Sequence, residues 1–130
     1  MADPKSLEPL PLRAADKIRR TARELFYRDG IRAVGVDEIV AQAGVTKPSL
    51  YRTYRSKDDL AVAVLVESGE MFWGYFNEAI DAHPGDPRAQ LLAFFAALAE
   101  RSVQTDYRGC PLSNAAVEYP EKGHIARAAD

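Results

Sequence analysis

Apolar residues recur at helical spacing along almost the whole chain, and this periodicity limits the possible fold more than any other feature of the sequence. Between residues 14 and 29, positions i, i+4, i+7 and i+8 form one apolar stripe, made of Ile18, Ala22, Leu25 and Phe26. No run alternates apolar and polar residues between turn residues, as a half-buried strand would. The sequence therefore predicts an all-α fold.

Glycine, proline and capping residues divide this helical pattern into six segments. Gly30 and Gly44 are expected to end helices, and Thr46, Ser56 and Asp86 are expected to cap the starts of helices. The predicted helices cover residues 14–29, 36–43, 47–53, 57–82, 87–103 and 110–118. The fourth is long and carries two apolar stripes, which predicts burial on more than one side, as in a helix that links two domains or lies inside a bundle.

Charge is distributed unevenly between the two parts of the chain. The 130 residues have a formal net charge of -2, which taken alone argues against a nucleic-acid partner. Residues 1–57, however, hold 12 Lys and Arg against 7 Asp and Glu, whereas residues 58–130 hold 5 against 12. Either the difference is only solvated surface, or a basic N-terminal part meets a polyanion; the motifs have to decide.

Few residues are available for disulfide or metal chemistry. One cysteine, Cys110, cannot form an internal disulfide, and with His83 and His124 it cannot supply a finger-type zinc site, so no metal or cofactor is expected. The longest apolar run, residues 91–99, is too short to cross a membrane. Residues 1–12 lack the apolar core of a secretory signal and are expected to form a flexible arm. The predicted location is the cytoplasm.

Residues 36–54, with the sequence VDEIVAQAGVTKPSLYRTY, have the pattern of a helix-turn-helix. Small residues at the helix crossing, Ala41 and Ala43, and the apolar Val45 at the turn meet its packing requirements. In this arrangement the second helix presents its N-terminal residues to the major groove of DNA. Spacing alone is weak evidence, because any two short packed helices joined by a glycine turn give the same pattern.

A wider set of motifs is more specific, and over residues 13–62 it strongly resembles the DNA-binding domain of the tetracycline-repressor (TetR) family of bacterial regulators. The motifs that carry the resemblance are Thr21-Ala22-Arg23-Glu24-Leu25-Phe26, Gly30, Ile39-Val40-Ala41, Ala43-Gly44-Val45-Thr46, Ser49-Leu50-Tyr51, Tyr54 and Ser56-Lys57-Asp58-Asp59-Leu60. A softer match, Arg108-Gly109-Cys110-Pro111-Leu112 with Asn114-Ala115-Ala116, resembles the start of the seventh helix in many members.

The resemblance implies a homodimer with an operator-binding helix-turn-helix domain, here residues 13–55, and a helical bundle for effector binding and dimerisation, here residues 56–130. It places a set of residues on the DNA face, namely Thr46, Lys47, Pro48, Ser49 and Tyr51, with Tyr54 and Lys57 at the flanking backbone. The chemistry agrees, because hydroxyl and ammonium groups bind phosphates, and Lys47 and Ser49 can reach base edges. Tyr51 and Tyr54 have an alternative role as aromatics that support the three-helix core.

Aromatic residues of the second part are candidates to line an apolar effector pocket. The candidate effector-binding residues are Trp73, Phe76, Phe94, Phe95, Tyr107 and Cys110. The competing interpretation is that each aromatic is ordinary core and that Cys110 is a buried structural residue. His124 lies far along the chain from Cys110 with no acidic partner at motif spacing, so no Cys-His nucleophile, and no enzyme, is expected.

The sequence departs from the family pattern at two places. Val34 and Gly35 stand where members usually carry hydroxyl residues before the second helix, which weakens the expected cap. The family also continues through two further long helices that form most of the dimer interface, so the chain is expected to be truncated at its C-terminal end or to dimerise differently.

Together these features predict a DNA-binding transcriptional regulator, a repressor that an unidentified small-molecule effector releases from its operator. The alternative is a small helical module for protein interaction or ligand binding, without DNA binding.

Overall fold

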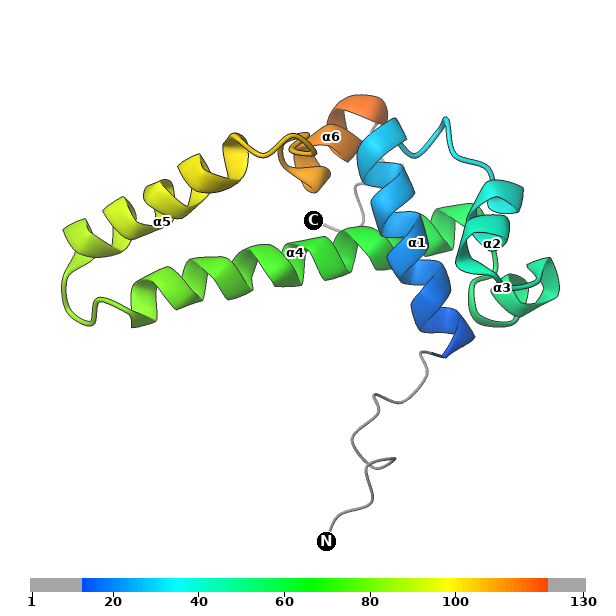
Figure 1. Ribbon diagram of the computed structural model, residues 1–130, viewed down its shortest axis with the longest axis horizontal. Helices are drawn as coiled ribbons and strands as arrows, with labels where there is room; N and C mark the ends of the chain where they lie inside the picture. The colour runs from blue at the N-terminus through cyan, green and yellow to red at the C-terminus, as the bar shows by residue number, and fades with distance from the viewer. Residues whose placement is uncertain (1–12, 122–130) are drawn as a thin grey trace, which may run out of the picture.

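The computed structural model describes residues 13–121, which form six α-helices and no strand (Figure 1). The helices are α1 (Ala14–Asp29), α2 (Val36–Ala43), α3 (Lys47–Thr53), α4 (Lys57–Asp81), α5 (Pro87–Ser102) and α6 (Pro111–Glu118). The all-α prediction is confirmed, and each predicted boundary agrees to within one residue. The expected arm, residues 1–12, and His124 lie outside the described residues.

The residues that start and end these helices are those that the sequence indicated. Backbone N–H groups three residues into α3, α4 and α5 donate to the side chains of Thr46 (3.3 Å), Ser56 (3.1 Å) and Asp86 (3.1 Å). Gly30 and Gly44 end α1 and α2 with positive φ angles of 87° and 69°, which other residues rarely adopt. Gly35 occupies the N-cap of α2 without a side-chain hydrogen bond, which agrees with the weak cap expected there.

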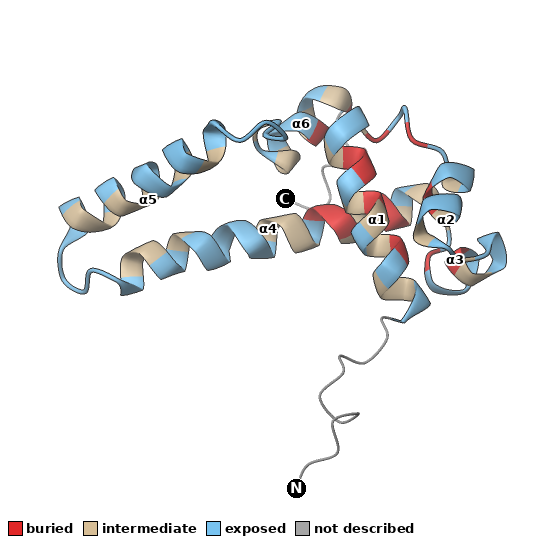
Figure 2. Cartoon of the chain, viewed as in Figure 1, coloured by how far each residue is buried: buried red, intermediate tan, exposed pale blue. Residues whose placement is uncertain are grey.

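The hydrophobic core lies where α1, α2 and α3 pack around the first part of α4. Its fully buried side chains come from all four helices and from the segment between α1 and α2: Ile18, Leu25, Val34, Ile39, Leu50 and Leu60. Figure 2 shows the buried residues gathered at this end of the molecule. The helix-turn-helix is therefore held on a single core that it shares with α1 and the start of α4.

The remainder of α4 forms an antiparallel hairpin with α5 that extends away from this core (Figures 1 and 2). No residue of α5 is buried, and the buried residues of α4 end at Leu65. The prediction that α4 is buried on more than one side is wrong for its distal half, where no residue after Leu65 is buried and Trp73 is 58% exposed. Within the described residues, no helix combines the length and apolar character needed to cross a membrane.

Helix α6 returns the chain to the helix-turn-helix domain and is tied to it by hydrogen bonds. The Glu118 carboxylate accepts from the backbone N–H groups of Ile31 (2.9 Å) and Arg32, in the segment that leads into α2. At the start of α6, the Tyr27 hydroxyl accepts from the N–H of Arg108 (2.6 Å) and donates to the carbonyl of Gly109 (2.9 Å). These contacts join the second part of the chain to the end of α1.

Candidate nucleic-acid interface

Helix α3 has one buried face and one exposed face. Leu50 is fully buried in the core and anchors the helix, whereas its neighbour Tyr51 is 46% exposed. Thr46, Lys47 and Pro48 at the start of the helix are also exposed, and Ser49 is half-buried. The five residues predicted for the DNA face thus lie together at the N-terminal half of α3 and leave polar groups open to a partner.

The hydroxyl groups at the start of α3 are already oriented. Thr46 Oγ1 accepts from the Ser49 backbone N–H and also lies 2.9 Å from Ser49 Oγ, at hydrogen-bond distance. Pro48 stands in the first turn of the helix, where its missing N–H has no internal partner to lose. The cap therefore fixes the backbone of the segment that is predicted to enter the groove.

Lys47 is held by an acidic residue that the sequence reasoning did not single out. Its ammonium Nζ lies 2.9 Å from Oδ1 of Asp37, in the first turn of α2. The hydrogen bond and the charge of Asp37 raise the pKa of Lys47 above its ordinary value, so the side chain carries a full positive charge at neutral pH. A Lys at the start of one helix and an Asp at the start of the neighbouring helix are the only sequence signal of this pair.

Tyr54 is placed in the core rather than on the exposed face of α3. Its side chain is only 8% exposed, and its hydroxyl donates to the carbonyl of Ala15 (3.5 Å) and accepts from Arg19 (3.4 Å) of α1. Tyr54 therefore has the alternative role considered for it, support of the three-helix core. Lys57 is the first residue of α4 and half-buried, three residues beyond the buried Tyr54.

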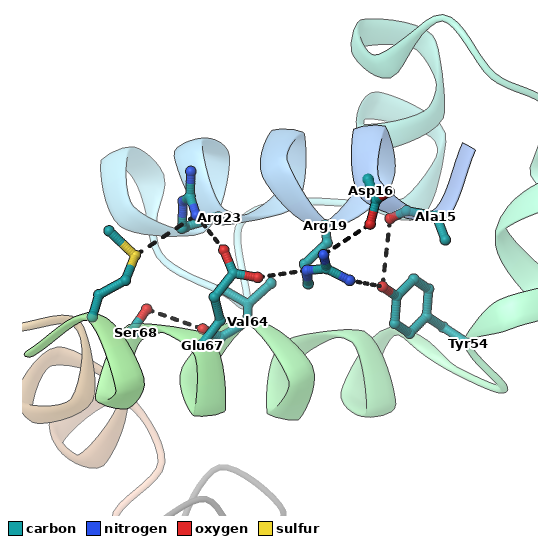
Figure 3. A network of polar contacts seen from close by, with 9 residues as sticks. Ala15, Asp16, Arg19, Arg23, Tyr54, Val64, Glu67 and Ser68 are labelled. Carbon is teal, nitrogen blue, oxygen red and sulfur yellow. Dashed lines mark hydrogen bonds and ion pairs between the residues drawn. The ribbon is translucent and has the colours of Figure 1, made fainter. Parts of the chain in front are cut away.

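A network of charged residues connects this core to α4. Glu67 of α4 accepts hydrogen bonds from both Arg19 and Arg23 of α1, and Arg19 also pairs with Asp16 at 2.9 Å (Figure 3). The hydrogen bonds from Arg19 to Tyr54 and Glu67 raise the pKa of the Arg19 guanidinium. Sequence reasoning missed this network, although two arginines four residues apart on one helix face repel each other unless an acid bridges them.

Four of the predicted effector-binding residues come together between α4 and α5. The ring centroids of Trp73 and Phe76 lie 5.5 Å apart, those of Phe76 and Phe94 5.4 Å, and those of Phe94 and Phe95 5.5 Å, all edge to face. These distances are favourable for aromatic pairs. The cluster is open to solvent, because Trp73 and Phe95 are exposed and Phe76 and Phe94 are half-buried.

The other two predicted effector residues, Tyr107 and Cys110, lie apart from this cluster, in the segment before α6 whose Gly109 contacts α1. Cys110 is exposed, so the interpretation of it as a buried structural cysteine is wrong. The reason is its position at the N-cap of α6, where the chain turns along the surface. Across residues 13–121, no three His, Cys, Asp or Glu side chains converge as a metal site requires.

Comparison with known proteins links this geometry to one family. The sequence profile of the bacterial regulatory proteins of the tetR family matches residues 18–64, from α1 into α4. Among curated proteins, the uncharacterized HTH-type transcriptional regulator YxaF of Bacillus subtilis is 29% identical over 105 residues, which are 79% of this chain and 54% of the relative. The HTH-type transcriptional activator FasR of Mycolicibacterium smegmatis is 50% identical over 44 residues, 34% of this chain and 20% of that protein.

Solved structures give the same result for the fold. A TetR-family transcriptional regulator from Streptomyces coelicolor matches with a TM-score of 0.83 and 32% identity, over 89% of this chain and 61% of that chain. A putative TetR transcriptional regulator from Streptomyces avermitilis matches with a TM-score of 0.75 and 29% identity, over 91% and 63%. The chain thus spans between half and two thirds of the length of these relatives, FasR excepted.

The relatives are regulatory proteins, in agreement with the prediction of a regulator and not of an enzyme. The profile covers the helix-turn-helix and the core that supports it, and the solved structures share the arrangement of nearly all of the described helices. The chain carries the helix-turn-helix domain of the TetR family of bacterial regulators and shares the fold of family members.

Proposed function

We propose that the chain binds duplex DNA through the N-terminal half of α3, as the reading element of a dimeric repressor that a small-molecule effector releases from its operator. The observation that carries this proposal is the division of α3 between a fully buried Leu50 and an exposed Tyr51. The buried residue holds the helix on the core, and the exposed residues at its start are free to enter a major groove.

Each group on this face has a role that suits its chemistry. The Thr46 and Tyr51 hydroxyls bind phosphates, as does the Lys57 ammonium at the start of α4, and these contacts position the protein. Lys47 and Ser49 reach base edges, where Lys pairs with the acceptor atoms of guanine and Ser with either kind of partner. Tyr54 is left out of this face because it is buried.

The charge distribution supports DNA as the partner. Residues 1–57 carry five more basic than acidic groups, and residues 58–130 carry seven more acidic than basic groups. A basic surface attracts the phosphate backbone and speeds association with it, whereas an acidic surface is repelled by the backbone. The exposed polar face of α3 and the basic part of the chain thus both favour DNA as the partner.

Dimerisation and effector release complete the proposed mechanism. Two copies place two α3 helices on half-sites about one helical turn, roughly 34–36 Å, apart. An effector that binds better to a different spacing shifts the population away from the DNA-bound form. The proposed effector site is the cluster of Trp73, Phe76, Phe94 and Phe95; Trp73 is the only tryptophan, so its fluorescence reports occupation.

Repression, action in the bacterial cytoplasm and release by an effector are proposed from the family resemblance. FasR, which is similar over 44 residues, is named as an activator, so the direction of regulation is a separate question from DNA binding. A reporter gene under a selected operator, with and without the protein, decides it. Lower expression with the protein supports repression, and higher expression contradicts it.

Lys47→Ala is expected to weaken DNA binding about tenfold, because a charge-assisted hydrogen bond contributes about 1.5–3 kcal/mol before solvent screening. Fluorescence anisotropy of a labelled duplex measures the affinity. The matched control is Arg88→Ala, which removes one positive charge from the exposed start of α5, at the far end of the hairpin from α3 (Figure 1). Equal losses in the two variants would show that only net charge matters and would contradict the assignment of the face.

Salt dependence distinguishes DNA binding from the alternative of a module without DNA. The logarithm of the binding constant is expected to fall linearly with the logarithm of salt concentration, with a slope of about -0.9 for each neutralised phosphate. Lys47→Ala should make this slope shallower if Lys47 neutralises a phosphate and leave it unchanged if Lys47 reads a base edge. The absence of any mobility shift at low salt would refute the proposed function.

Tyr51→Phe is expected to weaken DNA binding by about fivefold, equivalent to about 1 kcal/mol for one lost phosphate hydrogen bond. The ring and the fold are retained, so thermal unfolding should be unchanged. The same substitution at Tyr27, whose hydroxyl bonds to Arg108 and Gly109, should do the opposite: lower the stability and leave the DNA affinity of the folded protein intact. An unchanged affinity for Tyr51→Phe would remove that hydroxyl from the interface.

A further inference from the structure

The start of α3 carries an acidic neighbour that lies on the same exposed surface as the groups proposed to contact DNA. Asp37 Oδ1 is 2.9 Å from Lys47 Nζ, and the Asp37 side chain is 85% exposed. Asp37 and Glu38 both lie in the first turn of α2, but the ion pair is made by Asp37. The Asp37 carboxylate is therefore the ion-pair partner of the Lys47 ammonium, on which the proposed interface depends.

The Lys47 ammonium has two competing partners, the Asp37 carboxylate and a DNA phosphate. A phosphate that approaches the ammonium closely also comes within a few ångströms of the Asp37 carboxylate, and the two negative charges repel. The pair itself is exposed, so it opens at small cost when a better partner is present. Asp37 thus disfavours binding of DNA through Lys47 alone. The ion pair is expected to open when other contacts already hold the DNA in place.

We propose that Asp37 lowers the affinity of the protein for non-operator DNA by holding the Lys47 ammonium in an ion pair that has to open before Lys47 can bind a phosphate or a base. The inference rests on the proposed DNA-binding function and adds a residue that suppresses binding at that same face. Its partner is the phosphate backbone of duplex DNA that lacks the operator sequence, which is the competitor that a regulator meets in greatest excess.

The test uses the whole chain and a labelled mixed-sequence duplex of about 20 base pairs, long enough for two half-sites. Anisotropy titrations at about 0.1 M salt, where the Debye length is about 10 Å, compare the wild type with Asp37→Asn, Lys47→Ala and the double variant. Glu38→Gln is the matched control, because it removes the same charge from the adjacent exposed position of α2. Thermal unfolding of each variant checks that α2 remains folded.

We expect Asp37→Asn to tighten binding about three- to tenfold and Glu38→Gln to change it by less than about twofold. In the Lys47→Ala background, Asp37→Asn should change the affinity by less than about twofold, since its effect acts through Lys47. Equal tightening by Asp37→Asn and Glu38→Gln, or equal tightening with and without Lys47, would overturn the inference alone. No binding by the wild type at low salt would overturn the proposed function and the inference with it.

Discussion

Replacing Leu50 with alanine is expected to destabilise the protein by about 3 kcal/mol, within the range of about 2–5 kcal/mol for removal of a buried leucine side chain. Leu50 is fully buried and is the only buried residue of α3. The helix has seven residues, which is too short to be stable on its own, so its position depends on this anchor. The loss consists of the transfer free energy of the removed atoms and the cavity left between α1 and α3.

The neighbouring position provides the control for this prediction. Tyr51→Phe is one residue away on the exposed face, and we expect it to leave the free energy of unfolding within about 0.5 kcal/mol of the wild type. Urea denaturation followed by circular dichroism measures both variants. Leu50→Ala should lower stability, whereas Tyr51→Phe should weaken DNA binding. A Leu50→Ala protein as stable as the wild type would contradict the described position of α3.

Replacing Glu118 with alanine is expected to destabilise the protein by about 2 kcal/mol, since hydrogen bonds to a charged group contribute about 1.5–3 kcal/mol each and partial exposure reduces that value. The carboxylate accepts from the N–H groups of Ile31 and Arg32, and these donors lose their partner in the variant. Both donors belong to the short segment between α1 and α2. The substitution should therefore loosen the segment that positions the helix-turn-helix on α1.

Two further substitutions separate the hydrogen bonds from the negative charge. Glu118→Gln keeps one acceptor oxygen, so it should lose about half as much stability as Glu118→Ala. Glu121→Ala removes a nearby carboxylate whose pair with Arg32, at 3.8 Å, is exposed, and it should change stability by less than about 0.5 kcal/mol. Hydrogen exchange at Ile31 and Arg32 measures the local effect. Equal stabilities for Glu118→Ala and Glu121→Ala would contradict the described contacts of α6.

The helices and their ends could be predicted from the sequence because their signals are local. Thr46, Ser56 and Asp86 each accept the hydrogen bond expected of an N-cap, and Gly30 and Gly44 each adopt the positive φ expected at a helix end. Such signals depend on residues within one helical turn. The same is true of the apolar stripe of α1, whose predicted members are all buried.

The positions that could not be predicted depend on contacts between distant parts of the chain. Periodicity identifies an apolar stripe but not what covers it, which is why the distal half of α4 was expected to be buried while Trp73 is exposed. Helical spacing cannot distinguish a DNA contact from a core position for Tyr54. The hydrogen bonds of its hydroxyl with Ala15 and Arg19 of α1 place it in the core.

Polar contacts across the fold were missed for the same reason. Glu67 meets Arg19 and Arg23 from 48 and 44 residues away, and Glu118 meets the backbone of Ile31 from 87 residues away. None of these pairs has a characteristic spacing in the sequence. From sequence, charged residues on an amphipathic helix are first interpreted as a solvated face. Their pairing is visible only once α1 packs against α4 and the end of α6 lies beside residues 31 and 32.

Contact between the start of α3 and DNA can be measured from the backbone amide chemical shifts of the labelled protein during titration with a duplex. At 14.4 kDa the chain is small enough for every amide to be followed. We predict that the largest shift changes fall on residues 46–51 and on Lys57, with small changes in α5. Changes confined to the aromatic cluster between α4 and α5, or no changes at low salt, would contradict a DNA contact at the start of α3.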